Sequence, residues 1–227
     1  MGGCLEFHNE LKSNGLKPVI GCETYLAPGS RFDKRPDIPH VKGYHLILLA
    51  QNDQGYHNLC QLISEAHTNG FYYKPRIDKE LLAQYHEGII GMSACLQGEL
   101  DVAMLHGGVA EAEKVLADYV DIFGKDNFFL EIMYHGIKEQ ATVNRGFIEL
   151  SRKTGIPLVA TNDVHYLRKE HAKAQEIMLC IGTRTTMDDP NRMRMSSDEF
   201  YFKSGEELFE IFGTEAPEAI SNTVAIA

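Results

Sequence analysis

The chain has 227 residues, 44% of them hydrophobic, and its 22 basic and 32 acidic residues give a formal net charge of −10 at pH 7. This length suits one α/β domain of barrel size, and the acidic balance disfavours direct, sequence-independent binding to nucleic acid, which needs a basic surface. The five cysteines are widely spaced, and no apolar run approaches the roughly 18 residues of a membrane span. We therefore expect a cytoplasmic protein with no disulfide framework and no membrane association.

The first predicted elements are a short amphipathic helix at residues 4–11 and an apolar strand at 17–21. Asn14 and Gly15 are a plausible C-terminal cap for the helix. Units that alternate strands and helices ordinarily begin with a strand, because the helix needs a sheet on which to pack. We therefore expect that at least one strand upstream of Met1 is missing.

Four strand-then-helix units follow. Their apolar runs are mostly continuous, which is typical of a parallel sheet buried on both faces. Alternation of strands with helices indicates right-handed βαβ units, so the predicted fold class is α/β, either a barrel or an open sheet. The strands are expected at 44–50, 88–93, 127–132 and 156–160, and the helices at 55–66, 98–123, 138–154 and 169–181.

Two stretches interrupt this rhythm. Residues 27–43 form a loop rich in proline, glycine and charge, of a length that is usually functional, disordered or a family insertion. After residue 181 the sequence becomes polar, and helices follow at 205–212 and 218–227. We interpret residues 1–182 as the barrel domain and 183–227 as an extension leading toward a further domain.

Residues that bind metals follow several of the apolar runs, and in parallel α/β folds the functional site lies at the carboxyl ends of the strands. Carboxylate, imidazole and thiolate groups together suit divalent ions such as zinc, manganese or iron. The candidate metal ligands are Glu23, His67, Cys95, Asp163 and His165. Glu131 and His135 are interpreted as supporting residues at the same rim.

Asp163 and His165 are the strongest of these candidates. Residues two apart on a strand point to the same side, so both side chains could face one ion or two adjacent ions. A metal cluster binds phosphate oxygens and lowers the pKa of a bound water, which suits phosphoester hydrolysis. Taken singly, Glu23, Cys95 and His67 are better explained as a loop anchor, a small buried side chain and a helix cap than as metal ligands. The remaining histidines, His45 among them, are interpreted as structural or solvated.

Several long strings, in the same order, resemble motifs of the PHP domain of bacterial replicative DNA polymerases, the alpha subunits of DNA polymerase III. They include GCETYLAPG at 21–29, HLILLAQN at 45–52, GMSACLQGE at 91–99 and ATNDVHYL at 160–167. A further match begins with EAH at 65–67 and continues to KPRI at 74–77. The resemblance covers essentially the whole chain.

The resemblance implies a distorted, TIM-like β/α barrel, incomplete here, that binds up to three divalent metals through nine ligands. Carried over position by position, this sequence supplies five of them: Glu23, His67, Cys95, Asp163 and His165. The other four ligands are expected upstream of Met1, and the palm aspartates of nucleotidyl transfer beyond Ala227. The chain by itself is therefore expected to be inactive.

The implied function is that of a fragment of a DNA-directed DNA polymerase. Its PHP domain would either remove misincorporated nucleotides as a metal-dependent 3′–5′ exonuclease or support the polymerase structurally. The implied partners are DNA, through the parent chain, and replicase subunits such as the sliding clamp and a proofreading exonuclease. Two alternatives stay open: a free-standing PHP phosphatase acting on a small phosphate ester, and a non-catalytic scaffold.

Overall fold

The computed structural model describes residues 1–40 and 42–227, and its centre is one six-stranded sheet with strand order β3-β1-β2-β4-β5-β6. The sheet is open, with β3 and β6 at its edges. The strands are β1 Gly21–Leu26, β2 Tyr44–Ala50, β3 Arg76–Ile77, β4 Ile89–Met92, β5 Phe128–Met133 and β6 Leu158–Thr161. The predicted α/β class is confirmed.

Strand direction departs from the all-parallel prediction at β2. This strand pairs antiparallel with both β1 and β4, whereas β3 with β1, β4 with β5, and β5 with β6 are parallel. Parallel neighbours need a crossover connection, usually a helix. The described residues between β1 and β2 form no helix, so the chain turns back and β2 alone runs against the others.

The first strand was also predicted too early. Residues 17–19 precede the sheet, Ile20 contributes only its carbonyl as an acceptor for the Ala50 N–H, and β1 begins at Gly21. Pro18 has no N–H to donate to a strand ladder, which disfavours the earlier register. Glu23 consequently lies inside the strand and not after it.

The described part of the chain contains eight α-helices, and those predicted from the sequence lie within a few residues of their expected bounds. They are α1 Cys4–Ser13, α2 Asp53–Thr68, α3 Lys79–Gln84, α4 Glu99–Phe123, α5 Lys138–Thr154, α6 Ala172–Thr183, α7 Gly205–Phe212 and α8 Pro217–Ile226. Helix α3 was not predicted. None of the described helices is both long and apolar enough to cross a membrane.

Local signals explain where these helices begin. The Asn52 side chain accepts a hydrogen bond from the Gly55 N–H at the start of α2, and a Ser204–Glu207 capping box begins α7. Gly55 is required by packing, because a Cβ there would lie 1.7 Å from the Gly88 carbonyl oxygen. Helix α2 is therefore held against the turn that enters β4.

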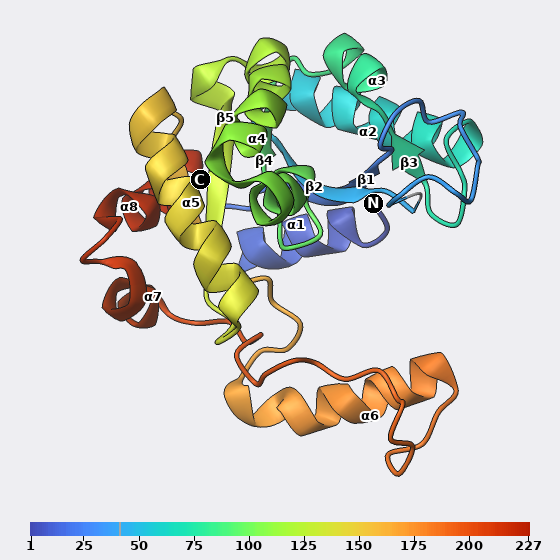
Figure 1. Cartoon of the computed structure of the whole chain (residues 1–227), viewed down its shortest axis with the longest axis vertical. Coiled ribbons are helices and arrows are strands. Elements are labelled where there is room, and N and C mark those ends of the chain that lie inside the picture. Colours follow the sequence, from blue (N-terminus) through green and yellow to red (C-terminus); the bar gives the residue numbers. More distant parts are fainter. Residues whose placement is uncertain (41) are drawn as a thin grey trace.

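The sheet is apolar on both faces, as its continuous apolar runs predicted. Alternate residues of each strand, such as Leu46 and Leu48 of β2 and Leu130 of β5, join helices α2 to α5 in the main core (Figure 1). The opposite face, called the inner face below, carries a second cluster that includes Met92 and Phe129, with Ile226 of α8 packed on it.

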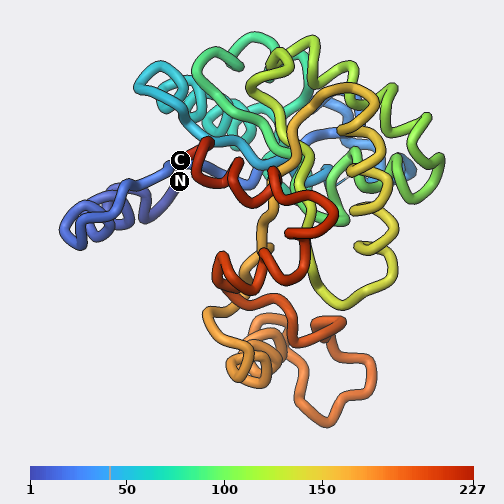
Figure 2. Tube along the Cα trace, turned by 90° about the vertical axis from the view of Figure 1, so that its left-hand side faces the viewer, coloured from blue at the N-terminus to red at the C-terminus, as the bar shows by residue number. Residues whose placement is uncertain are grey.

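The last part of the chain leaves the sheet and returns to it. Helix α6 and the loop after it project from the body of the molecule (Figures 1 and 2). Helices α7 and α8 then pack back, and Leu208, Phe212 and Ala219 belong to the main core. The domain boundary at 182/183 stays a prediction.

Candidate metal centre at the carboxyl edge of the sheet

Strand directions gather the polar residues at one edge of the sheet. Every strand except β2 ends at this edge, and β2 begins there. A hydrogen bond joins the start of β2 to the turn after β4 at this edge: the His45 N–H donates to the Gln97 carbonyl, at 3.0 Å. Cross-strand register places Glu23, His45 and Glu131 on the inner face near this edge, with the Cys95 turn and Asp163 just beyond β4 and β6.

His45 lies between two of the predicted ligands. Its Nδ1 is 3.4 Å from Glu23 Oε1 and 3.5 Å from Cys95 Sγ, and the ring packs edge-on against Tyr25. Both partners use the same ring nitrogen. A Cys–His–Glu nucleophilic triad needs the base to use its two nitrogens separately, so this arrangement does not form one. His45 instead holds the carboxylate and the thiol near each other.

The sequence interpretation set His45 aside as structural or solvated. A usable signal was present, since His45, Ile47 and Leu49 alternate along one strand face, and a polar residue in an otherwise apolar face needs a partner.

A second group surrounds Asp163. Its Oδ2 is 4.0 Å from His135 Nε2, and its Oδ1 is 3.9 Å from His165 Nδ1. Phe200, from the returning segment before α7, stacks on the His135 ring at 4.2 Å and meets His165 edge-on at 5.3 Å. His165 also donates its backbone N–H to the Phe200 carbonyl. The returning segment thus forms one wall of the site, which the sequence did not suggest.

The Asp-x-His pair does not lie on a strand, as the sequence argument assumed. Strand β6 ends at Thr161, and Asp163 has a φ of 47°. Ala94, in the equivalent place after β4, has a φ of 67°. Positive φ is uncommon outside glycine, and it is found preferentially where function constrains the backbone. The two strained residues flank the same edge of the sheet.

Glu131 lies at the centre of the edge and is buried. Its Oε2 accepts from the Ala94 N–H at 2.5 Å, and its Oε1 accepts from the Thr161 hydroxyl at 2.9 Å. Burial raises the pKa of the Glu131 carboxyl to about 7, against the lowering effect of these two hydrogen bonds, and the charges of Asp163 and Glu23 raise it further. Glu131 therefore connects the turn after β4, which carries Cys95, to the end of β6, which precedes Asp163.

His135 and Asp101 are also buried polar groups near this edge. His135 Nε2 accepts or donates no hydrogen bond among the described residues, and burial lowers the pKa of the ring. Both carboxyl oxygens of Asp101, in α4, likewise have no partner there, and burial raises the pKa of this group. Buried polar atoms without partners are rare in folded proteins and call for an explanation.

Cys95 is expected to be a slowly reacting thiol in the metal-free protein. Burial, reinforced by the negative charge of Asp163, raises the pKa of Cys95 to about 12, and only the thiolate is nucleophilic. We expect alkylation by iodoacetamide at pH 8 to be at least about tenfold slower than in the urea-unfolded chain. Time-resolved peptide mass spectrometry measures this rate, and equal rates in the two states would contradict the prediction.

The structure brings four of the five predicted ligands to this edge: Glu23, Cys95, Asp163 and His165. His67 lies exposed in the last turn of α2, whose carboxyl end reaches the same end of the sheet, near β3. No hydrogen bond or ion pair joins His67 to the other four among the described residues. Within the same residues, no three His, Cys, Asp or Glu side chains are grouped closely enough to hold a metal ion.

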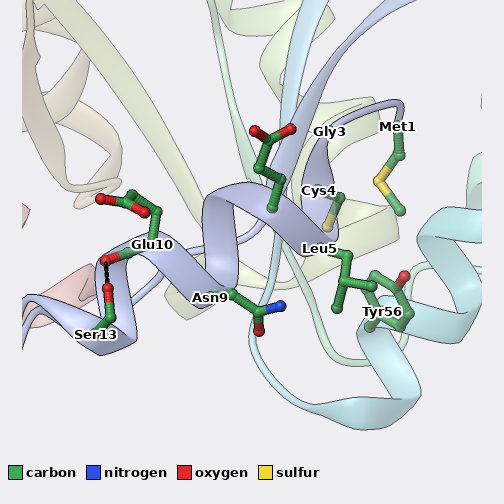
Figure 3. A pocket seen from close by; sticks show the side chains of 9 residues that line it. Met1, Gly3, Cys4, Leu5, Asn9, Glu10, Ser13 and Tyr56 are labelled. Atoms are coloured by element: carbon green, nitrogen blue, oxygen red, sulfur yellow. Dashed lines mark hydrogen bonds between the residues drawn. The ribbon is translucent and has the colours of Figure 1, made fainter.

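A hollow of about 860 Å³ lies elsewhere, between α1 and Tyr56 of α2 (Figure 3). Tyr56 is in the first turn of α2, at the end of the sheet opposite the edge described above. Apart from the Tyr56 hydroxyl, the polar side chains that line the hollow come from α1, and the Ser13 hydroxyl donates to the Glu10 carbonyl of that helix. The hollow brings none of the predicted ligands together.

Comparison with known proteins gives two findings. A family model described as "PHP domain" matches residues 1–135. Curated relatives named "DNA polymerase III subunit alpha" match nearly the whole chain. The protein from Treponema pallidum (strain Nichols) is 48% identical over 227 residues, covering 100% of this chain and 19% of the relative.

Two further relatives of the same name are similar. The Borreliella burgdorferi protein is 46% identical over 225 residues, and the Thermus aquaticus protein is 45% identical over 228 residues; each match covers 99% of this chain and 19% of the relative. The chain therefore spans about a fifth of the length of the curated relatives it matches.

Proposed function

This chain belongs to the PHP domain family, and we propose that it is the PHP domain of a bacterial replicative DNA polymerase, with a metal-dependent phosphoesterase site at the carboxyl edge of its sheet. The observation that carries the proposal is that Glu23, Cys95, Asp163 and His165 lie along one edge of the sheet, in two neighbouring groups. The substrate would be the phosphodiester at the 3′ end of a DNA strand. The open sheet is compatible with a distorted β/α barrel that further strands would close.

The donors at this edge suit zinc, manganese or iron by type. Two carboxylates, an imidazole and a thiol are the ligands that such ions take in proteins. The buried, unpartnered Nε2 of His135 supplies a further donor 4.0 Å from Asp163. A bound metal ion would bind phosphate oxygens and lower the pKa of a water molecule. His67 would complete the donor set from the end of α2.

The surrounding residues would orient these donors. His45 positions Glu23 and Cys95 through its Nδ1, and the edge contact with Tyr25 restrains the ring. Glu131 ties the turn at Ala94 to Thr161, two residues before Asp163. Loss of a residue that orients a metal ligand typically lowers metal affinity by about 10- to 100-fold. Phe200 stacks on the buried His135 ring and meets the exposed His165 ring edge-on.

A structural role is the second candidate. It is favoured by the absence of any close group of three metal-binding side chains among the described residues. In this role the domain would support the polymerase and dock replicase subunits such as the sliding clamp or a proofreading exonuclease, in the cytoplasm. The long loop between β1 and β2 and the segment after α6 distinguish the chain from a compact free-standing phosphatase.

Substitution of the predicted ligands separates the two roles. In the full-length gene product, we expect Asp163→Asn and His165→Ala each to lower bound metal, measured by mass spectrometry of the metals, and to reduce 3′–5′ exonuclease activity by at least about 100-fold. Asp126→Asn and His106→Ala are matched controls, because both side chains are exposed and far from the edge. Unchanged metal content and nuclease activity in the ligand variants would leave only the structural role.

A further inference from the structure

Beside the candidate metal centre, three segments bring aromatic rings and exposed lysines together. Tyr25 of β1, Lys42 before β2, and Tyr73 and Lys74 before β3 form what we call the basic–aromatic patch. We propose that this patch binds single-stranded DNA and guides its 3′ end toward the metal centre. The guiding role rests on the proposed function, whereas the binding can be tested without it.

The contacts within the patch are of two kinds. Lys42 Nζ lies 5.6 Å from the centroid of the Tyr73 ring, and Lys74 Nζ lies 5.2 Å from that of Tyr25. Both lysines are exposed, and neither forms an ion pair with a carboxylate among the described residues. Their charges are therefore available to phosphates. Tyr73 is 58% exposed, and Phe71 in the same turn is 51% exposed, so both rings offer surface for stacking.

Buried hydrogen bonds and an ion pair hold the segments that carry the patch together. Asp78 forms an ion pair with Arg31 at 2.8 Å, and Arg76 donates to the carbonyls of Arg31 and Asp33. These buried bonds fasten the loop after β1 to the segment that carries Tyr73. His40 and Tyr73 have φ values of 55° and 59°. Such strained backbone persists only where the surroundings hold it, and it concentrates at functional sites.

The patch adjoins the metal centre through Tyr25. The Tyr25 ring meets the His45 ring edge-on, with centroids 5.2 Å apart, and His45 contacts Glu23 and Cys95. A strand bound over Lys74 and Tyr73 would therefore have only one aromatic ring between it and the predicted ligands. A chain of contacts therefore leads outward from the predicted ligands Glu23 and Cys95 to His45, from His45 to Tyr25, and from Tyr25 to Lys74.

This chemistry fits single strands better than other anionic partners. Exposed rings stack on unpaired bases, and flanking cations follow the phosphate backbone, which is the recurrent pattern of single-strand binding. Duplex DNA hides its base faces, and the carboxylates of an acidic peptide pair with lysines but do not stack on exposed rings. The net charge of −10 repels nucleic acid elsewhere on the chain, so binding would be confined to the patch and would weaken steeply with salt.

Photocrosslinking tests the proposal in the full-length gene product, because it reports position even where other regions bind DNA. The probe is a single-stranded oligodeoxythymidylate with a photoreactive thymine near its 3′ end. We expect crosslinks on the peptide that contains Phe71 and Tyr73. Lys42→Gln with Lys74→Gln should reduce their yield at least about fivefold, and should lower the slope of log affinity against log salt by about 1.4.

Three further variants make the result specific. Lys42→Arg with Lys74→Arg keeps both charges and should retain the crosslink yield. Tyr73→Ala removes the stacking ring and should lower the yield at least about fivefold. Lys173→Gln with Phe209→Ala is the matched control, since both side chains are exposed on helices distant from β3 (Figure 1). This control should crosslink as the unmodified protein does.

The outcomes separate the patch from the proposed function. Crosslinks that map only elsewhere, or that survive the double Gln substitution, overturn the patch. Displacement of the probe from Tyr73 by polyglutamate but not by unlabelled single strands would also overturn it, and would indicate an acidic protein partner. Crosslinking at Tyr73 in a protein that binds no metal would keep the patch as a binding surface and contradict the phosphoesterase proposal alone.

Discussion

Replacing Asp78 by alanine is expected to lower the free energy of unfolding by about 3–5 kcal/mol. Asp78 is 2% exposed and its carboxylate accepts from the Arg31 guanidinium at 2.8 and 3.0 Å and from the Arg31 N–H at 2.8 Å. It also caps α3 by accepting from the Leu81 N–H. The substitution leaves the Arg31 charge buried without its counter-ion, and the cost arises mainly there.

Urea denaturation followed by circular dichroism measures this change. Asp33→Ala is the matched control, because Asp33 pairs with Arg35 in the same loop but at the surface, where ion pairs contribute little. We expect no measurable change in that variant. If Asp78→Ala were as stable as Asp33→Ala, the loop after β1 would not depend on the buried pair, and the rigidity assigned to the basic–aromatic patch would lose its support.

Replacing Glu131 by glutamine is expected to stabilise the metal-free protein by about 3 kcal/mol above pH 7. The pKa of the Glu131 carboxyl is raised from 4.5 to about 7 by burial. Between these two pH values the unfolded chain releases a proton that the folded protein keeps. Stability of the unmodified protein should therefore fall as the pH rises from about 4.5 to about 7 and then remain at the lower level.

Glutamine keeps the hydrogen bonds and removes the charge. Its oxygen can accept from the Ala94 N–H and its amide can donate to the Thr161 hydroxyl, in the positions that the carboxylate oxygens occupy. The part of the pH-dependent loss that Glu131 causes, about 3 kcal/mol, should disappear, as followed by urea denaturation in EDTA between pH 4.5 and 8. Buried Asp101, whose pKa is also raised, keeps its own contribution in both proteins. Glu149→Gln, at an exposed position of α5, is the control and should retain the pH dependence. Parallel profiles for Glu131→Gln and the unmodified protein would refute the raised pKa.

The expected gain in stability on removing the Glu131 charge indicates that this residue is not optimised for stability. A carboxyl group that weakens the fold when ionised is retained beside Asp163, where its charge would favour a bound cation. Proteins commonly keep such unfavourable groups where activity needs them. Metal binding at the edge would offset the cost, since an ion that binds only the folded state stabilises it by mass action.

The sequence by itself determined the secondary structure of most segments, the burial of both sheet faces and the family. These properties are local, because hydrophobic periodicity and apolar run length report which faces of an element are buried. The resemblance also predicted Glu23, Cys95, Asp163 and His165 as metal ligands, a prediction that no observation here tests, and the structure places these four side chains at one edge of the sheet.

Only the tertiary structure decided the direction of β2, the position of His45 and the wall formed by Phe200. The predicted loop at residues 27–43 contains no crossover helix, which is compatible with an antiparallel return to β1. The apolar run of β2, however, looks like those of the parallel strands, so the local pattern did not reveal that β2 runs against both of its neighbours. His45 reaches Cys95, and Phe200 reaches His135, only because the sheet and the returning segment bring distant parts of the chain together. Such proximity depends on strand order and register, which periodicity along one element does not encode.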